Sequence, residues 1–235
     1  MGFESWRAFY QSDLQGVWLL LPVPAAFLAW LLLSRRARER AARSSEARFL
    51  FYWALLFSAE TLLDPLVGTL LVRWLGLSSG LATAVMLLFV LLGDFRVYWL
   101  LFAVALRDVR GGAQLAAAVT PAVPVLAWAS NWLLERFAPD ATGQRLWLIH
   151  ELLFSGVAAW LWGAWLRRRV SDAATLRFLR RVCAYVMLYY GLWAACDALW
   201  LATSLDVAWL LRVLPNQLYY AFFVPFVWLA GSRRA

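Results

Sequence analysis

Two carboxylates four residues apart interrupt a run of the sequence that is otherwise apolar. Glu60 and Asp64 share one face of a helix at this spacing, and Pro65 beside them lacks a backbone N–H and can open the helical hydrogen-bond ladder. A charged side chain at bilayer depth costs at least ~2.5 kcal/mol on insertion scales, so such residues usually face the interior of a helical bundle and serve a function. We therefore interpret Glu60 and Asp64 as candidate groups for proton transfer.

Further polar and aromatic side chains lie at related depths in other apolar runs. At a rise of about 1.5 Å per residue, Asp94 falls near the middle of its run, while Asn216 and Asp197 lie further toward the outer end. The candidate catalytic acids are Glu60, Asp64, Asp94 and Asp197, and the candidate substrate-binding residues are Tyr98, Tyr190, Trp193, Trp200, Asn216, Tyr220 and Arg96. Together they predict an acidic and aromatic cavity that opens outward, between the second, third, sixth and seventh apolar runs.

One arginine also lies inside an apolar run and needs a partner there. Arg96 is two positions from Asp94, so the two side chains point about 200° apart around a helix. Because an arginine stays charged in a protein, an acid from another helix should lie beside it. We expect Arg96 either to pair with an acid such as Glu60 or Asp64, or to extend its side chain to the membrane interface.

The composition sets the class of protein. The 235 residues are 64% hydrophobic and 15% charged, with a mean hydropathy of +0.67, whereas soluble proteins have roughly 45 to 50% apolar and about 25% charged residues. A membrane-crossing helix needs about 20 apolar residues. The sequence predicts an all-α, polytopic membrane bundle of about seven transmembrane helices, forming one domain over residues 1–235. The predicted spans are about 14–33, 49–75, 81–106, 113–134, 146–166, 182–203 and 207–230.

The arginines indicate the orientation of these spans. The chain has a net charge of +8, and 16 of its 22 arginines lie in the predicted loops after spans 1, 3 and 5 and in the C-terminal tail. By the positive-inside rule, the N-terminus is outside and the C-terminus is in the cytoplasm. The charge is thus explained without a nucleic-acid partner. An all-arginine basic set is typical of GC-rich bacterial genomes, so the expected location is the bacterial cytoplasmic (inner) membrane.

Several chemistries lack the residues that they need. The chain has no lysine for a retinal Schiff base, and its only histidine, His150, cannot supply bis-histidine haem or a multi-histidine metal site. Cys183 and Cys196 lie roughly 20 Å apart on one predicted helix and cannot form a disulfide with each other. We expect no metal and no cofactor. His150 is placed at the outer interface, and whether it and Glu151 belong to the site is left open.

Three features resemble the YhhN-type lysoplasmalogenases, which are small polytopic lipid hydrolases. They are Gly93-Asp94 in the middle of one span, Asp197 in the penultimate span, and Tyr219-Tyr220 in the last span. The resemblance implies that Asp94 and Asp197 are the catalytic acids.

The residues suit this chemistry independently of the resemblance. Cleaving a vinyl ether requires a proton delivered to carbon, from a protonated carboxyl group, and water added to the oxocarbenium ion, assisted by an ionised carboxylate. Acid-initiated cyclisation of a polyprenyl chain would use the same groups, with aromatic faces stabilising the carbocation. The sequence therefore predicts a metal-independent acid–base enzyme that acts on a lipid-like or small hydrophobic substrate among membrane lipids.

Two other classes of function fit the same pattern. Carboxylates at mid-depth and proline-broken helices are also used by small proton-coupled transporters. A seven-helix protein that binds a ligand and signals through its arginine-rich loops is a third hypothesis. The oligomeric state is left open by the sequence.

Overall fold

A computed structural model of the chain describes residues 4–137 and 143–232. All regular structure in these two ranges is helical, and seven segments are long and apolar enough to cross a membrane. They are Leu14–Leu33, Ser45–Trp74, Ser79–Leu106, Val109–Glu135, Gly143–Arg169, Ala173–Thr203 and Val207–Ser232. The predicted all-α class with seven spans is confirmed, and each predicted span overlaps one of these segments. The orientation of the termini stays a prediction, and the two tail arginines that it counts, Arg233 and Arg234, lie outside the described residues.

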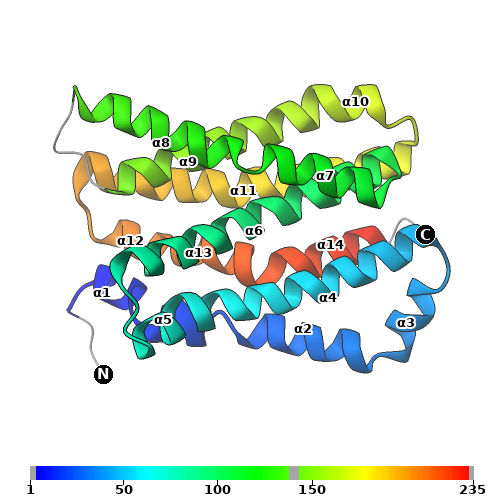
Figure 1. Cartoon of the computed structure of the whole chain (residues 1–235), viewed down its shortest axis with the longest axis horizontal. Helices are drawn as coiled ribbons and strands as arrows, with labels where there is room; N and C mark the ends of the chain where they lie inside the picture. The colour runs from blue at the N-terminus through cyan, green and yellow to red at the C-terminus, as the bar shows by residue number, and fades with distance from the viewer. Residues whose placement is uncertain (1–3, 138–142, 233–235) are drawn as a thin grey trace. The chain divides into compact units, whose positions relative to one another are not determined.

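Most of the spans consist of more than one helical element (Figure 1). The first half of the chain contains α1 (Trp6–Tyr10), the π-helix η1 (Leu14–Trp18), α2 (Pro22–Leu33), α3 (Arg35–Ala41), α4 (Ser45–Pro65), the π-helix η2 (Leu66–Leu71), α5 (Val72–Trp74), α6 (Ser79–Leu106) and α7 (Val109–Val119). The second half contains α8 (Ala122–Glu135), α9 (Gly143–Trp160), the π-helix η3 (Leu161–Trp165), α10 (Leu166–Arg169), α11 (Ala173–Thr203), α12 (Val207–Leu211), α13 (Val213–Asn216), the π-helix η4 (Gln217–Phe222) and α14 (Phe223–Ser232).

The chain divides into two compact units. Unit 1 consists of Met1–Gln11 and Ala118–Asn216, and unit 2 of Ser12–Ala117 and Gln217–Ala235. The last span belongs to both, because α12 and α13 fall in unit 1 whereas η4 and α14 fall in unit 2. The expectation of a single transmembrane domain stays a prediction, and each unit is described by itself.

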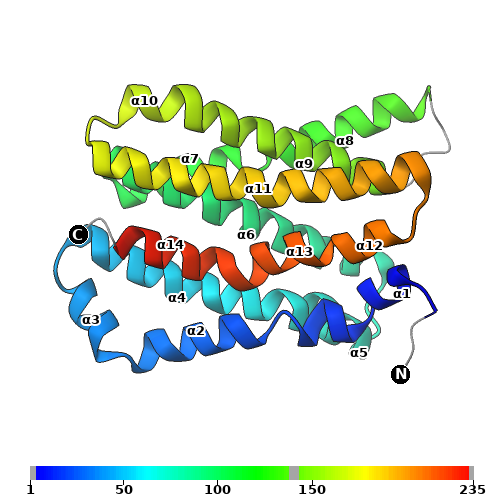
Figure 2. The same cartoon turned by 180° about the vertical axis from the view of Figure 1, so that it is seen from behind.

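In unit 2, α4 packs against α2, α6 and α14. The helices α2, α4 and α14 run side by side in both cartoon views (Figure 1 and Figure 2). Large buried aromatic side chains pack between α4 and α14. The centre of the Trp53 ring on α4 lies 5.2 Å from that of Phe57 on the same helix and 6.1 Å from that of Phe223 on α14. This packing fixes the buried faces of α4 and α14 that carry the acid and tyrosine residues of the site.

In unit 1, α9 packs against α8 and α11, and the short α1 packs against α12. The α9 and α11 helices lie side by side in Figure 2, with the Phe154 and Tyr190 rings stacked at 4.5 Å. The start of α1 is tied to unit 1 by Asp206, whose carboxylate accepts hydrogen bonds from the backbone N–H groups of Trp6 and Arg7. Helix α11 also packs against α12 and α13.

The two stretches that the sequence predicted as arginine-rich loops are largely helical. Ser34 caps α3, its hydroxyl accepting a hydrogen bond from the backbone N–H of Ala37. Asp172 caps α11 in the same way through the N–H of Thr175, so that Arg180 and its neighbours lie on a helix. The loop prediction was wrong because arginine does not disfavour helix, and the N-caps add about 1 kcal/mol each to helix stability.

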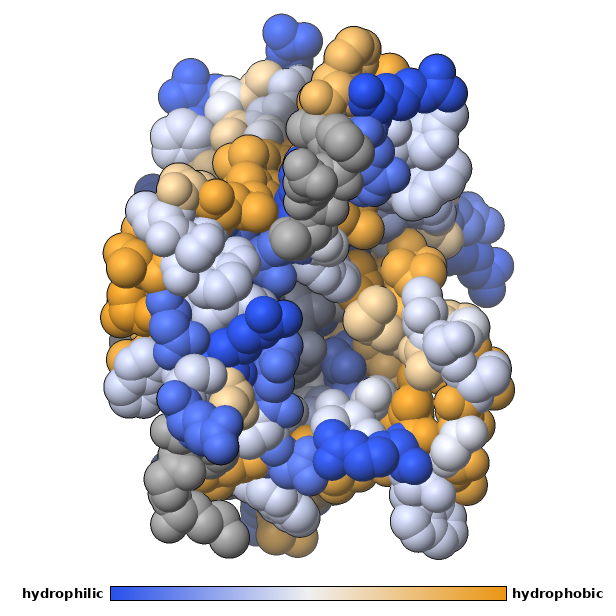
Figure 3. All heavy atoms as spheres, turned by 90° about the vertical axis from the view of Figure 1, so that its left-hand side faces the viewer, coloured by the Kyte–Doolittle hydropathy of each residue, from blue (hydrophilic) through white to orange (hydrophobic). Residues whose placement is uncertain are grey.

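Apolar side chains cover much of the outside of the helices. Trp74 is 81% exposed, Leu33 79% and Trp128 63%, as expected for residues that face lipid. On the face drawn in Figure 3, strongly hydrophilic residues lie among residues of intermediate hydropathy. Such mixing is typical of the boundary between bilayer and water, where aromatic and charged residues meet.

Candidate functional site

The predicted partner of the buried arginine is confirmed. In unit 2, Nη1 of Arg96 on α6 lies 3.3 Å from Oε2 of Glu60 on α4, and both side chains are almost fully buried. The other carboxylate oxygen of Glu60, Oε1, has no hydrogen-bond partner among the described residues. One oxygen of Glu60 therefore neutralises Arg96, while the other is buried without a hydrogen-bond partner in the described part of the chain.

Four groups besides Glu60 surround Arg96. Its Nη2 donates a hydrogen bond to the backbone carbonyl oxygen of Tyr219, at 3.1 Å, and its Cζ lies 4.1 Å from the centre of the Tyr219 ring and 5.1 Å from that of Phe223. The Trp53 indole N–H donates to the Arg96 carbonyl at 3.1 Å. A guanidinium over two aromatic faces gains cation–π attraction in addition to its ion pair. Arg96 is therefore fixed in position and links α4, α6, η4 and α14.

The second acid of the pair has a neutral partner. Asp64 is half-buried, and its carboxyl group is hydrogen-bonded to the hydroxyl of Tyr220 on η4. The Tyr219 and Tyr220 rings meet edge to face, with their centres 4.7 Å apart. Two carboxyl groups on one face of α4 thus lie in different surroundings, one beside a guanidinium and one beside a phenol.

The backbone around these acids is irregular. Helix α4 ends at Pro65, directly after Asp64, and continues as the π-helix η2, while Tyr219 and Tyr220 lie in the π-helix η4. Proline removes a helical hydrogen bond, and π-helical turns are frequent at functional sites. A π-turn also changes which residues share a face, and for this reason α-helical spacing singled out Tyr220 but not Tyr219 as a binding residue.

Asp94 borders the same cluster from α6. Its side chain is fully buried, and it lies within electrostatic reach of Tyr98 and Tyr219. The preceding residue, Gly93, is where Tyr219 approaches closest: a Cβ at this position would overlap the Tyr219 hydroxyl oxygen and lie 2.9 Å from its Cζ. The structure therefore brings together in unit 2 the predicted site residues Glu60, Asp64, Asp94, Arg96, Tyr98 and Tyr220.

Gly93→Ala is expected to lower the free energy of unfolding by about 1 to 3 kcal/mol, the usual cost of forcing extra atoms into a packed core. The rigid Tyr219 ring, held by Arg96, cannot move aside without disturbing the ion pair. Thermal unfolding of the purified variant in detergent measures this. Gly191→Ala on α11 is the control, because a Cβ there would meet nothing within 4 Å. Equal melting temperatures for the two variants would contradict the close approach.

Unit 1 contains a second buried charge cluster, around Asp197 of α11. Asp197 forms an ion pair with Arg212 and accepts a hydrogen bond of 3.0 Å from the Gln144 side chain. Nη2 of Arg212 lies 3.9 Å from Oε1 of Glu151 on α9. Two acids and one arginine are thus buried together, and Glu151 is part of this cluster.

The predicted binding residues Tyr190, Trp193, Trp200 and Asn216 lie in the same unit as Asp197, and each contacts other polar or aromatic residues of that unit. The Asn216 side-chain oxygen accepts hydrogen bonds from the Trp193 indole N–H at 3.0 Å and from the Tyr10 hydroxyl at 3.1 Å. The Trp200 ring lies 5.5 Å from that of Trp209, and Tyr190 lies 6.0 Å from His150, which is buried among aromatic rings. The depth predicted for His150 in the membrane stays a prediction.

Three residues of this cluster were not predicted as site residues: Arg212, Gln144 and Tyr10. For Arg212 the signal was present, since it precedes Asn216 by four residues and shares its helical face. Gln144 and Tyr10 lie near the ends of the spans, where the sequence pattern carries little information on side-chain direction. Cys183 and Cys196 are free cysteines, which agrees with the prediction that they do not bridge.

The predicted cavity would need residues of both units, and it stays a prediction. Within residues 4–137 and 143–232, no group of three or more histidine, cysteine or acidic side chains is placed to hold a metal ion. Comparison with known proteins finds no matching family model, no matching curated protein and no matching solved structure. The proposals for function therefore depend on the chemistry of the two clusters.

Proposed function

We propose that this protein is a multi-pass enzyme of the bacterial cytoplasmic membrane that performs acid–base chemistry on a lipid or isoprenoid substrate. The observation that carries the proposal is the contrast between two carboxyl groups on one face of α4: Glu60 lies beside the Arg96 guanidinium, whereas Asp64 lies beside the Tyr220 phenol. Pairs of acids in contrasting environments are how enzymes assign the acid and the base roles.

In this proposal Asp64 delivers the proton and Glu60 is the fixed anion. The Arg96 guanidinium favours the ionised form of Glu60, whose buried Oε1 faces no partner in the described part of the chain. An ionised carboxylate stabilises positive charge that develops on a substrate. The Tyr220 hydroxyl orients the Asp64 carboxyl group, so that the transferred proton has a defined position.

Hydrolysis of a vinyl ether illustrates the steps. The Asp64 proton adds to the vinyl carbon that is remote from oxygen, and the C=C electron pair forms the new C–H bond, leaving an oxocarbenium ion. Water adds to the carbon next to oxygen and returns one proton to the Asp64 carboxylate. The hemiacetal then breaks its C–O bond and releases a fatty aldehyde and an alcohol. These steps use water, the Asp64 carboxyl group as proton donor and the Glu60 carboxylate as the fixed anion.

The resemblance to lysoplasmalogenases supports this reaction class and adds Asp94 as a catalytic acid. Asp94 is buried next to Tyr219, in the same unit as Glu60 and Asp64. The resemblance gives the same role to Asp197, which in unit 1 is paired with Arg212. Our proposal differs here, because an acid held by a guanidinium is a poor proton donor. We assign the proton-donor role to Asp64 and a structural role to the Asp197 pair.

Purified protein incubated with a lysoplasmalogen, an ordinary lysophospholipid and a polyprenyl substrate tests the proposal. We expect one substrate with an acid-sensitive double bond to be converted, giving a fatty aldehyde from the vinyl ether or a cyclic product from the polyprenyl chain. The ester-linked lysophospholipid is the control and should remain intact. No conversion of any of the three would contradict the enzymatic function.

A second candidate function is proton-coupled transport. It is favoured by the irregular helix beside the acids, since η2 follows Asp64 and Pro65 directly and η4 carries Tyr220. Carriers place such breaks next to their coupling carboxylates. In proteoliposomes with a pH gradient, a carrier would show substrate uptake that stops in Asp64→Asn, and the wild type would convert none of the three lipids.

A further inference from the structure

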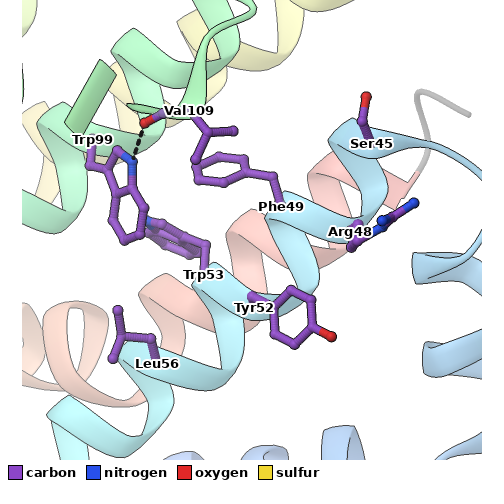
Figure 4. A pocket seen from close by; sticks show the side chains of 8 residues that line it. All are labelled: Ser45, Arg48, Phe49, Tyr52, Trp53, Leu56, Trp99 and Val109. Carbon is purple, nitrogen blue, oxygen red and sulfur yellow. Dashed lines mark hydrogen bonds between the residues drawn. The ribbon is translucent and has the colours of Figure 1, made fainter. Parts of the chain in front are cut away.

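A laterally open groove in unit 2 lies outside the acid cluster. It has a volume of about 470 Å³, within the usual range of roughly 300 to 1,000 Å³ for sites of small ligands. Figure 4 shows the residues that line it: Ser45, Arg48, Phe49, Tyr52, Trp53 and Leu56 on α4, Trp99 on α6 and Val109 at the start of α7. The Trp99 indole N–H donates to the Val109 carbonyl oxygen at 3.1 Å and closes one wall.

The groove has one polar end and one apolar end. Ser45 and Arg48 lie at one end and Leu56 at the other, with the rings of Phe49, Trp53 and Trp99 between them (Figure 4). From Ser45 to Leu56 the helix rises roughly 16 Å at about 1.5 Å per residue. That length is close to half of a hydrocarbon core about 30 Å thick. The length of the groove therefore matches the thickness of one leaflet.

The polar end carries an excess of positive charge. Arg48 is exposed, and its guanidinium forms no ion pair or hydrogen bond with any residue that the structure describes. Arg40 lies on α3, with its guanidinium against the Trp228 ring, and Arg43 lies between α3 and α4; neither lines the groove. Of the nearby acids, Asp108 accepts from the backbone N–H groups at the start of α7, and neither it nor Glu46 lines the groove.

We infer that this groove binds one anionic glycerophospholipid, with its phosphate on Arg48 and Ser45 and one acyl chain along the aromatic wall toward Leu56. Each juxtamembrane arginine attracts an anionic headgroup, and the hydroxyl of Ser45 adds a donor at the same level. The lining between Arg48 and Leu56 is mostly aromatic, which suits an acyl chain. This lipid site uses none of the acids of the cluster and does not rest on the proposed reaction, although Trp53 borders both sites.

Native mass spectrometry of the purified protein, titrated with dioleoyl phosphatidylglycerol or dioleoyl phosphatidylcholine, tests the inference. We expect one phosphatidylglycerol to bind more tightly than any phosphatidylcholine. Arg48→Gln should weaken that binding about fivefold, as expected for the loss of one arginine contact with an anionic lipid surface, and leave phosphatidylcholine binding unchanged. Arg43→Gln is the matched control, because it removes the same charge from the same segment outside the groove.

Blocking the groove provides an independent readout. Val109→Trp adds a large side chain at an exposed position in the groove wall, so the fold should tolerate it. We expect this variant to lose the tightly bound phosphatidylglycerol while Arg48 remains in place. Equal affinity for the two lipids, equal losses in Arg48→Gln and Arg43→Gln, or retained binding in Val109→Trp would each overturn the inference.

Discussion

Asp64→Asn is expected to lower turnover by about 10²- to 10⁴-fold, the usual contribution of a general acid or base. The amide keeps the shape of the side chain and can still accept a hydrogen bond from Tyr220, but it cannot deliver a proton. Because Asp64 is half-buried and forms no ion pair with a described residue, the fold should persist. The measurement is the rate of product formation, with thermal unfolding of the same sample as the check on folding.

Asp13→Asn is the matched control for Asp64. It makes the same change in unit 2, at an acid whose partner is the exposed Arg73, 2.9 Å away. Exposed pairs of this kind contribute about 0 to 1 kcal/mol, so turnover and melting temperature should stay close to those of the wild type. Turnover of Asp64→Asn within a few-fold of the wild type would remove Asp64 from the mechanism.

Asp197→Asn separates our assignment from the one that the resemblance implies. If Asp197 is a catalytic acid, the variant should fold normally and lose turnover as Asp64→Asn does. If Asp197 serves to neutralise the buried Arg212, the variant should instead unfold at a lower temperature. Measuring both quantities on one preparation distinguishes the two roles.

The architecture could be predicted because it follows from composition alone. Seven apolar runs of sufficient length leave few alternatives for a chain that is 64% hydrophobic. The limits of the helices were harder to predict, since Ser34 and Asp172 extend helical structure into the arginine-rich segments through one hydrogen bond each. A hydropathy profile of the sequence does not reveal such capping hydrogen bonds.

The partner of Arg96 could also be predicted, because a permanent charge in an apolar run requires an acid. The spacing of Arg96 and Asp94 on one helix directed the search to Glu60 or Asp64, and the structure selects Glu60. The role of Tyr219 could not be derived, since it depends on a π-helical turn that places its carbonyl oxygen and its ring against Arg96. No sequence signal distinguishes such a turn from an ordinary one.

Glu60→Gln is expected to lower the free energy of unfolding by about 3 to 5 kcal/mol, the cost of leaving a buried charge without its partner. The Arg96 side chain is fully buried, so water cannot replace the lost carboxylate. The double variant Glu60→Gln with Arg96→Met should recover most of this loss, because no uncompensated charge remains and a methionine fills similar apolar space. Thermal or denaturant unfolding in one detergent compares the three proteins.

The exposed pair between Arg35 and Glu39 on α3 is the matched control. Its charged atoms are 2.7 Å apart, closer than the 3.3 Å between Arg96 and Glu60, but the two side chains are 88% and 57% exposed. Distance alone would make this pair the stronger one, whereas screening by water reduces an exposed helical pair to about 0.3 to 0.5 kcal/mol. Glu39→Gln should therefore change stability far less than Glu60→Gln. If the two variants lose equal stability, or if Arg96→Met restores nothing to Glu60→Gln, the buried pair does not hold α4 and α6 together.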